Sequence, residues 1–554
     1  MFNKLSILGT AVLIGLGTLA SADSLAAERS ELTLVAEQRT AWDRNFNPYL
    51  TANKRATTFQ FIYEPLVVFN ALKGNQAHYR LATAHEFSDD LKTIRFTIRD
   101  GVKWSDGEQF SAKDVLYSFE QIKKDPVLDT QALADRIESV SIEGENVVAI
   151  KLKNVDTTIA NKIVRVPIVP QHIWSQIDSP TTFKNETPVG TGPFTEIDSF
   201  TAQLYVQCAN PHYYDAENLD IDCLKMPQIA TNDQLLAAAI KGELDWTSSF
   251  IPDIDRVLIS ANPSYNYWYP AAGSASFLVN FKSPNPGNRE AFNDINFRRA
   301  FSMTVDRQAV VDIAGYGYWS TNQYASGLGE QFASWNNPQV DAEFGQYNRY
   351  DLEGAKQLLS DAGYKDTDGD GFLNTPSGAE ISFKVIVPNG WSDFVSTAQI
   401  GVEGLQELGV DASVSTPEFV TLTENMKSAD FDAAFTNYFG GATPYRYFQT
   451  GFHSSMADKD RFGAHHYADP ELDSLIDSFT KTADSAEQVK IMQDIQYRIG
   501  ANQTTIPTMS TVYLYQFNDK RFSGWFSEAN PQAVPVVWPD QPERLLHVLA
   551  LKPR

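Results

Sequence analysis

Strand-like and helix-like segments alternate along the whole chain, and this mixture limits the fold more than any single motif does. Residues 147–152 have the pattern of a strand, whereas residues 234–240 and 354–362 have the spacing of helices. Such mixing is typical of the α/β class. At 554 residues the chain is too long for one hydrophobic core, so we expect two or three domains. No internal repeat or low-complexity linker separates them, so we expect the chain to cross between domains more than once.

The charge balance argues against nucleic acid and anionic membrane surfaces as partners. The formal net charge is −24 at pH 7, whereas those partners are bound by clusters of lysine and arginine. A neutral or cationic small ligand suits such a protein better. No G-x-S-x-G, H-E-x-x-H or phosphate-binding glycine motif occurs, so we do not expect an enzyme. A glycosidase is the alternative class, because 69 acidic residues offer many carboxylate pairs.

The first 26 residues have the pattern of a cleaved secretory signal. Lys4 supplies a positive charge, residues 5–20 form an apolar run, and Ser24 and Ala26 are small residues where a signal peptidase would read them. The run is too short for a good membrane span, and no later segment approaches the roughly 20 apolar residues that a span needs. We therefore expect an exported, soluble protein cleaved near Ala26. No cysteine follows the cut, so we do not expect a lipid anchor.

Cys208 and Cys223 are the two cysteines of the chain. In an oxidising compartment an isolated, close pair is most simply a disulfide. A metal site is the competing interpretation, but two cysteines with His212 as the one nearby histidine make a poor ligand set.

Two further segments have some features of metal sites. Residues 366–374 begin like a calcium-binding loop, but Ser377 stands where the loop needs a bidentate glutamate. We interpret this segment as a solvated turn. The pair His465 and His466 has no spaced cluster of carboxylates and histidines beside it. We therefore expect no metal and no cofactor.

The most specific stretch of the sequence covers residues 81–119. It combines a strand over 93–98, a turn over 105–107 and a helix that Ser111 and Asp114 cap in the manner of a capping box. This arrangement resembles the signature of the family 5 extracellular solute-binding proteins, the oligopeptide, dipeptide and nickel receptors of ABC importers. The supporting pieces follow in the family's order at residues 61–67, 166–174, 188–194 and 296–310.

The resemblance implies a periplasmic binding protein type II-like fold, with two lobes around a hinged cleft and an extra third domain. Carried onto this sequence, domain I comprises residues 27–70, 195–290 and 520–554, domain II residues 71–194, and domain III residues 291–519. Ligand binding would close the lobes. The implied partners are an ABC permease and its ATPase subunits, with a membrane sensor as a further candidate, and the receptor is expected to be a monomer.

Several short segments resemble more closely the branch of the family that binds β-linked oligosaccharides, particularly chitin oligosaccharides. They are residues 44–50, 210–224, 242–256, 325–329, 388–394, 436–445 and 542–553. The implied ligand is chitobiose or a longer chain. An oligopeptide or dipeptide receptor is the alternative. Peptide-binding members tend to hold the peptide's amino terminus with an aspartate, and the matching position falls near Gly440, where an unpaired ammonium would be costly to bury.

An exposed tryptophan next to a carboxylate raises the question of what it binds. Trp391 follows the turn 388–390 at the end of a strand-like segment, and Asp393 lies two residues later. A β-linked sugar has an apolar face that packs on an aromatic ring and a hydroxyl rim that planar polar groups can bind. The resemblance implies stacking by Trp391, Phe439, Phe462 and Trp538, and polar contacts from Asp393, Asn437 and Asn232. Arg55 is a further candidate, and ordinary core packing is the alternative for each.

Overall fold

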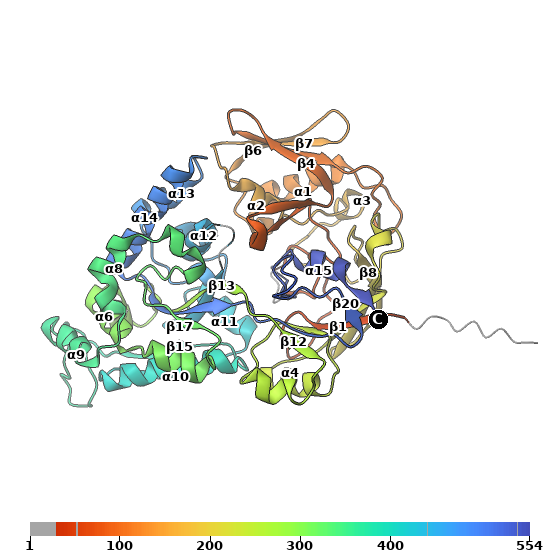
Figure 1. Cartoon of the computed structure of the whole chain (residues 1–554). Coiled ribbons are helices and arrows are strands. Elements are labelled where there is room, and N and C mark those ends of the chain that lie inside the picture. The colour runs from red at the N-terminus through yellow and green to blue at the C-terminus, as the bar shows by residue number, and fades with distance from the viewer. Residues whose placement is uncertain (1–28, 51–53, 440, 442, 540) are drawn as a thin grey trace, which may run out of the picture.

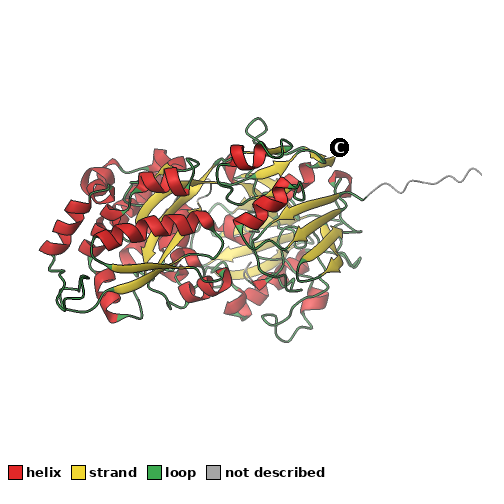
Figure 2. Cartoon of the chain, turned by 90° about the horizontal axis from the view of Figure 1, so that it is seen from below, coloured by secondary structure: helices red, strands yellow, loops and turns green. Residues whose placement is uncertain are grey.

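The computed structural model describes residues 29–50, 54–439, 441, 443–539 and 541–554, so the predicted signal peptide over residues 1–26 lies outside the described residues. Three large sheets organise this part of the chain (Figure 1). We call the parts built on the seven-, four- and six-stranded sheets domains I, II and III. Both halves of the molecule mix helices with strands (Figure 2), which confirms the predicted α/β class.

Domain I is built on the sheet β12-β19-β11-β1-β10-β9-β8. Strand β1 pairs in parallel with β10 and β11, and the other pairs are antiparallel. Its elements are β1 (Glu31–Val35), β8 (Phe194–Phe200), β9 (Leu204–Ala209), β10 (Cys223–Pro227), α4 (Asn232–Ile240), β11 (Trp246–Thr247), β12 (Tyr265–Tyr267), β19 (Gln516–Asn518), β20 (Phe522–Ser523), α15 (Arg544–Ala550) and β21 (Lys552–Pro553).

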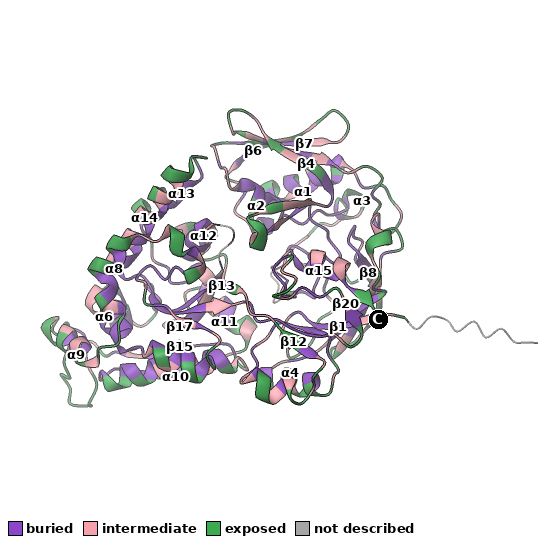
Figure 3. Ribbon diagram, viewed as in Figure 1, coloured by how far each residue is buried: buried purple, intermediate pink, exposed green. Residues whose placement is uncertain are grey.

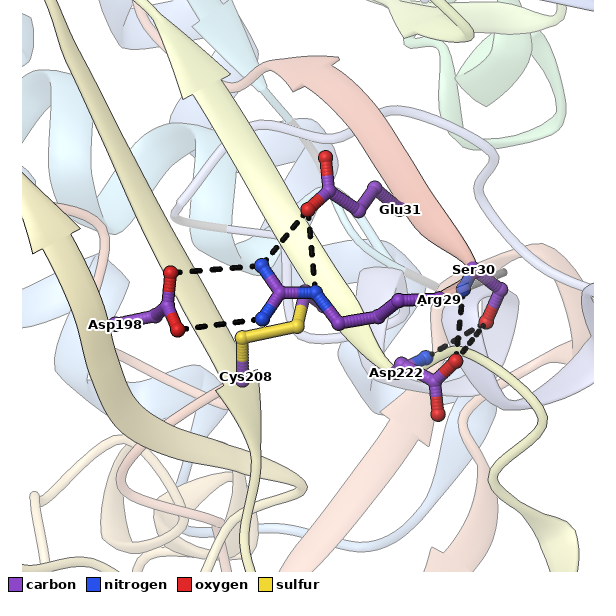
Figure 4. The surroundings of a disulfide bond; sticks show 7 residues. Arg29, Ser30, Glu31, Asp198, Cys208 and Asp222 are labelled. Carbon is purple, nitrogen blue, oxygen red and sulfur yellow. Dashed lines mark hydrogen bonds and ion pairs between the residues drawn. A yellow bond between two sulfur atoms is a disulfide. The ribbon is translucent and has the colours of Figure 1, made fainter. Parts of the chain in front are cut away.

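The predicted disulfide is confirmed. Cys208 and Cys223 are direct cross-strand partners in the β9–β10 pair, and their sulfurs are bonded. The start of β1 is tied down beside this bond (Figure 4): the Arg29 guanidinium donates to the carboxylates of Glu31 and Asp198. The cross-link ties β9 to β10, and the ion pairs tie the segment before β1 to β8.

Domain II is built on the antiparallel sheet β4-β5-β7-β6. The predicted strands over 93–98 and 147–152 are β5 and β7, and the predicted capping box is present, with the Ser111 N–H donating to Asp114 Oδ2 at 2.9 Å. The elements are β2 (Val67–Asn70), β3 (Gln76–Tyr79), β4 (Ala82–Phe87), β5 (Thr93–Ile98), α1 (Ala112–Lys124), β6 (Ile137–Glu143), β7 (Val147–Leu152), α2 (Ile159–Ile163) and α3 (Gln171–Trp174).

Domain III is built on the sheet β14-β18-β13-β17-β15-β16, with α10 and α12 on opposite sides of it (Figure 1). Strand β15 pairs in parallel with β16 and β17. The strands are β13 (Ala271–Val279), β14 (Ser320–Thr321), β15 (Ser382–Ile386), β16 (Asp411–Ser415), β17 (Ala433–Phe439) and β18 (Ile506–Val512). The helices are α5 (Pro286–Asn293), α6 (Ile295–Thr304), α7 (Arg307–Ala309), α8 (Pro338–Phe344), α9 (Leu352–Asp361), α10 (Ser392–Glu407), α11 (Phe419–Lys427), α12 (Tyr445–Phe452), α13 (Pro470–Phe479) and α14 (Ser485–Asn502).

The chain crosses between domains I and III at residues 268–270 and 513–515, between β12 and β13 and between β18 and β19. The sequence-based boundaries had put the crossings at 290 and 519. The difference arises because β13 is apolar over most of its length, and composition does not reveal which sheet a strand joins. β13 pairs with β17 and β18 and therefore belongs to the sheet of domain III.

The hydrophobic cores group the molecule into two lobes, and buried residues lie within both of them (Figure 3). One continuous hydrophobic core runs through domains I and II, and includes both Leu34 and Phe96. A second core, around Phe277 and Phe435, lies mainly in domain III and also includes Phe250 of domain I. Domains I and II therefore share one packed core, and the backbone passes from them into domain III at the two crossings. Among the described residues, no helix has the length and apolar composition that crossing a membrane requires.

Candidate functional site

A cavity of about 390 Å³ lies between domains I and III. Segments that follow the carboxyl ends of β1, β11 and β15 contribute to its lining, which is where ligands bind in open α/β sheets. The cavity brings together six of the residues that the sequence pointed to. They are Asn232 and Trp538 from domain I, and Trp391, Asp393, Asn437 and Phe462 from domain III.

The turn before Trp391 is fixed by its contact with domain I. Gly390 has a φ of +80°, and a Cβ atom at this position would lie 2.8 Å from Cγ2 of Thr231, so the turn needs glycine. The N–H of Asn232 donates to the carbonyl of Gly390 at 3.3 Å. The residue before Trp391 thus lies directly against the start of α4, across the boundary between the domains.

Trp391 is half-buried, which differs from the expectation of an indole held out from the protein. Its ring stacks on Phe419 with centroids 5.3 Å apart and contacts the edge of Phe394 at 5.2 Å. The residue also lines the cavity. The three rings form an aromatic wall, of which the sequence identified Trp391 alone. Phe419 begins α11, and its position beside Trp391 depends on tertiary packing that no local pattern indicates.

Asp393 is a buried carboxylate at the start of α10. Its side chain is 6% exposed, and burial raises its pKa to about 6. The N–H groups of Phe394 and of Asp393 itself, and the side-chain amide of Asn232, oppose this shift by hydrogen bonding to the charged form. Asp393 therefore changes its charge at a pH much closer to neutrality than an ordinary aspartate does.

Asn232 links the two lobes next to this carboxylate. Its Oδ1 accepts a hydrogen bond from Gln38 Nε2 at 2.7 Å, and its Nδ2 donates to Ser392 Oγ at 3.1 Å. Gln38 and Asn232 belong to domain I and Ser392 to domain III. The amide is 4% exposed and is held in one orientation by these partners. Asn232 is therefore suited to fix the geometry around Asp393. Its hydrogen bond to Ser392 would break if the lobes separated.

A second polar group in the cavity is built around Arg461, which the sequence analysis did not identify. Its Nη2 donates to Asn437 Oδ1 at 2.8 Å, and its guanidinium lies over Phe462 at 4.4 Å and over Phe419 at 5.8 Å. Arg461 thus helps to position the amide of Asn437, a predicted site residue, and the two aromatic rings. The one local signal was its position immediately before Phe462.

Trp538 closes the cavity from the side of domain I. Its indole N–H donates to the carbonyl of Ser248 at 2.7 Å, and its ring centroid is 6.0 Å from that of Tyr513. The hydrogen bond fixes the ring, which lines the cavity together with the residues of domain III. Aromatic side chains therefore reach the cavity from both lobes.

Two of the predicted site residues are not among those described as lining the cavity. Arg55 does not line it: Nε donates to the carbonyl of Leu50 at 2.9 Å and Nη1 to Thr58 Oγ1 at 2.8 Å. Burial lowers the pKa of Arg55 to about 10. These contacts serve the local backbone of domain I. Phe439 is the last residue of β17, and its side chain lies outside what the structure describes.

The ionisable lining of the cavity is balanced. Four acidic and four basic side chains contribute to it, namely Glu37, Asp393, Glu418 and Asp460, and Arg39, Lys427, Lys459 and Arg461. Some pair directly, as Arg39 Nε does by donating to Glu37 Oε2 at 2.6 Å. A balanced lining with several aromatic rings suits an uncharged, amphipathic ligand better than a strongly charged one.

The histidine pair and the aspartate-rich turn differ in character. His465 Nε2 lies 2.7 Å from the carbonyl of Gly451, and His466 Nε2 lies 2.8 Å from that of Met426. Both rings are buried and engaged by backbone, and burial lowers the pKa of His465 to about 4. The carboxylates of Asp366, Asp368 and Asp370 are exposed and lie close together, and Asp366 accepts hydrogen bonds from N–H groups of its own turn.

Comparison with known proteins identifies the family. The family described as bacterial extracellular solute-binding proteins, family 5 middle, matches residues 76–459. The chain belongs to this family. Family 5 members are receptors that bind solutes and act with the permease and ATPase subunits of ABC importers, so the predicted family, fold and class of partner are confirmed at this level.

The curated relatives of this family 5 protein include an oligopeptide-binding protein. It is 26% identical over 436 residues to protein XP55 of Streptomyces lividans, covering 76% of this chain and 73% of that protein. It is 25% identical over 423 residues to the oligopeptide-binding protein AppA of Bacillus subtilis, covering 73% of each.

Two solved structures show the same fold. A periplasmic oligopeptide-binding protein of Thermotoga maritima, solved with mannohexaose, has a TM-score of 0.86 at 22% identity and covers 95% of this chain and 99% of that one. AppA of Bacillus subtilis with a nonapeptide has a TM-score of 0.79 at 20% identity, with the same coverage.

Proposed function

We propose that this family 5 protein is the periplasmic receptor of an ABC importer for β-linked oligosaccharides, with chitobiose or a longer chitin oligosaccharide as the ligand. In this proposal domains I and III close on the sugar, and the closed receptor delivers it to the permease. One observation carries the proposal: Trp391, Phe462 and Trp538 line a single cavity together with the polar groups of Asn232 and Asp393.

The chemistry of this lining matches a β-linked sugar. The apolar face of each pyranose can pack on an aromatic ring, and the equatorial hydroxyls need groups that accept or donate in a plane. Asp393 supplies an acceptor, and the amide of Asn437, held by Arg461, can serve an N-acetyl group or a pair of hydroxyls. The balanced charges of the lining also favour an uncharged ligand. The mannohexaose in the Thermotoga maritima structure indicates that this fold can hold an oligosaccharide.

An oligopeptide ligand is the alternative, and the relatives favour it, since AppA is described as oligopeptide-binding. The carboxylates of Asp393, Glu418 and Asp460 line the cavity and could hold a peptide's ammonium group. The sequence position near Gly440, where the absence of an acid argued against peptides, lies outside the described residues. The two ligand classes must therefore be separated by experiment.

Ligand-linked stability separates these alternatives. At a concentration 100-fold above its dissociation constant, a ligand that binds only the folded protein stabilises it by about 2.7 kcal/mol. We expect chitobiose to raise the melting temperature strongly, cellobiose to raise it less, and an uncharged-side-chain tripeptide to leave it unchanged. We also expect saturating chitobiose to compact the protein in small-angle scattering.

Three results would contradict the proposal. A melting temperature that rises with the tripeptide and not with chitobiose would replace the sugar by a peptide. Chitobiose incubated with the protein should be recovered intact, because release of the monomer would indicate a glycosidase. A scattering profile that stays the same under a ligand that raises the melting temperature would argue against closure of the lobes.

A further inference from the structure

Domain II contacts domain III directly, although none of its described residues lines the cavity. The N–H of Thr157 donates to the carbonyl of Thr480 at 2.8 Å, and Thr157 Oγ1 lies 3.4 Å from the carbonyl of Thr482. Nearby, Arg136 Nη2 lies 3.6 Å from Asp477 Oδ1. These contacts join the two lobes at a place other than the backbone crossings and the ligand cavity.

On each side of this contact, interactions within the same domain hold the contacting residues in place. In domain II, Asp156 is 3% exposed, receives Arg136 Nη1 at 3.0 Å and accepts a hydrogen bond from the N–H of Thr158 at 3.0 Å. In domain III, Asp477 lies on α13, and His453 Nε2 is 3.5 Å from its Oδ1. His453 and Arg136 hold the pKa of Asp477 below its usual range, so it stays charged. The contact therefore joins two preformed surfaces.

The polar contact between domains II and III has the chemistry of an interface that can separate and form again. Domains I and II share one hydrophobic core, so separating them would expose a large apolar surface. The bonds between Thr157 and Thr480 and between Arg136 and Asp477 are polar, and water can replace both partners when they part. Separation of domain III from domain II is therefore the cheaper motion, and it is the motion that would open the cavity.

We propose that Arg136, Thr157, Asp477 and Thr480 form a clasp that is made when the lobes are closed and that sets how fast a ligand leaves. This proposal rests on the part of the proposed function in which the lobes close on a ligand. It does not depend on which sugar the ligand is. Because the residues of the clasp do not touch the cavity, the clasp should act on the dissociation rate for any ligand. It should leave the association rate nearly unchanged, since the lobes are open when a ligand enters.

The first test changes the charge of Asp477 and follows dissociation of chitobiose by stopped flow. The side chains of Arg136 and Asp477 are 23% and 42% exposed, so the pair is partly screened and its effect is moderate. We expect Asp477→Asn to raise the dissociation rate about threefold and Asp477→Lys, which repels Arg136, about tenfold. The matched control is Glu143→Lys, which reverses an ion pair with Arg95 inside domain II. Glu143→Lys should leave the dissociation rate unchanged. Equal dissociation rates in the unsubstituted protein and in all three variants would overturn the clasp.

The second test needs no ligand, so it separates failure of the clasp from failure of the proposed function. In a Thr157→Cys/Thr480→Cys variant, mild oxidation should trap the lobes by a disulfide when they close transiently, because the two backbones are in direct hydrogen-bond contact in the structure. Adding Asp477→Lys should slow this cross-linking about tenfold, whereas adding Glu143→Lys should not. A cross-linking rate that Asp477→Lys leaves unchanged would contradict the clasp even if chitobiose proved not to be the ligand.

Discussion

Replacing Trp391 by alanine should weaken the binding of chitobiose by roughly 30-fold or more. An aromatic anchor in a binding site typically costs about 2 kcal/mol or more when truncated, and each 1.4 kcal/mol is a factor of ten. Trp391 is placed for this role because it lines the cavity and Phe419 supports one face of its ring. Calorimetric titration of the variant with chitobiose measures the loss directly.

The same variant separates a sugar platform from ordinary packing. Trp391 is half-buried against Phe394 and Phe419, so we expect its loss to cost about 1–2 kcal/mol of unfolding free energy without ligand, less than the 3–5 kcal/mol of a fully buried aromatic. Trp335, which is also half-buried but does not line the cavity, provides the matched control. Trp335→Ala should lose stability and keep its affinity. Large destabilisation of Trp391→Ala with near-normal affinity would mean that Trp391 only packs.

Replacing Asp393 by asparagine should stabilise the ligand-free protein at neutral pH. Burial raises the pKa of Asp393 from its ordinary value to about 6, so the folded state binds a proton more readily than the unfolded state does. For a carboxyl group shifted in this direction, stability falls as the pH rises from about 4 to about 6, and the loss is complete above that window. A shift of about two units corresponds to up to about 3 kcal/mol, which the asparagine should restore at pH 7.

Urea denaturation at pH 4, 5, 6 and 7.5 tests this expectation. The difference in unfolding free energy between Asp393→Asn and the unsubstituted protein should grow across the window and then level off. Asp361→Asn, at an exposed position at the end of α9, should follow the unsubstituted protein within about 0.5 kcal/mol. Calorimetry on Asp393→Asn should show weaker binding of chitobiose, because an acceptor of its hydroxyls is lost. If the difference in unfolding free energy between Asp393→Asn and the unsubstituted protein is no larger at pH 7 than at pH 4, Asp393 carries no buried charge.

Local patterns predicted the elements better than their assembly. The strand over 147–152 and the capped helix after Ser111 needed no tertiary information, because periodicity and capping chemistry are local. The crossing before β13 was missed because an apolar strand fits either sheet. The candidate site followed a similar division. Resemblance pointed to residues such as Trp391 and Trp538 that line the cavity, whereas Arg461 and Phe419 gain their roles only from packing across segments far apart in the sequence.

Arg55 was predicted as a binding residue on weak local context, and the contacts that the structure gives it are local ones. It follows a short polar segment near the start of domain I, and nothing in the sequence shows that its guanidinium serves the carbonyl of Leu50 and the hydroxyl of Thr58. Buried arginines in proteins often satisfy backbone carbonyls in this way, because their fixed donors suit several acceptors at once. A binding role for an arginine therefore needs the geometry of the cavity as well as the residue type.

The central claim is that an uncharged β-linked sugar, rather than a peptide, binds between domains I and III. Calorimetric titration of the unsubstituted protein with chitobiose and with a tripeptide, under identical conditions, tests it most directly. The account predicts a saturable heat of binding for chitobiose, with one site per chain, and no heat above dilution for the tripeptide. Saturable binding of the tripeptide with no heat from chitobiose would contradict it and would assign the aromatic cavity to peptides.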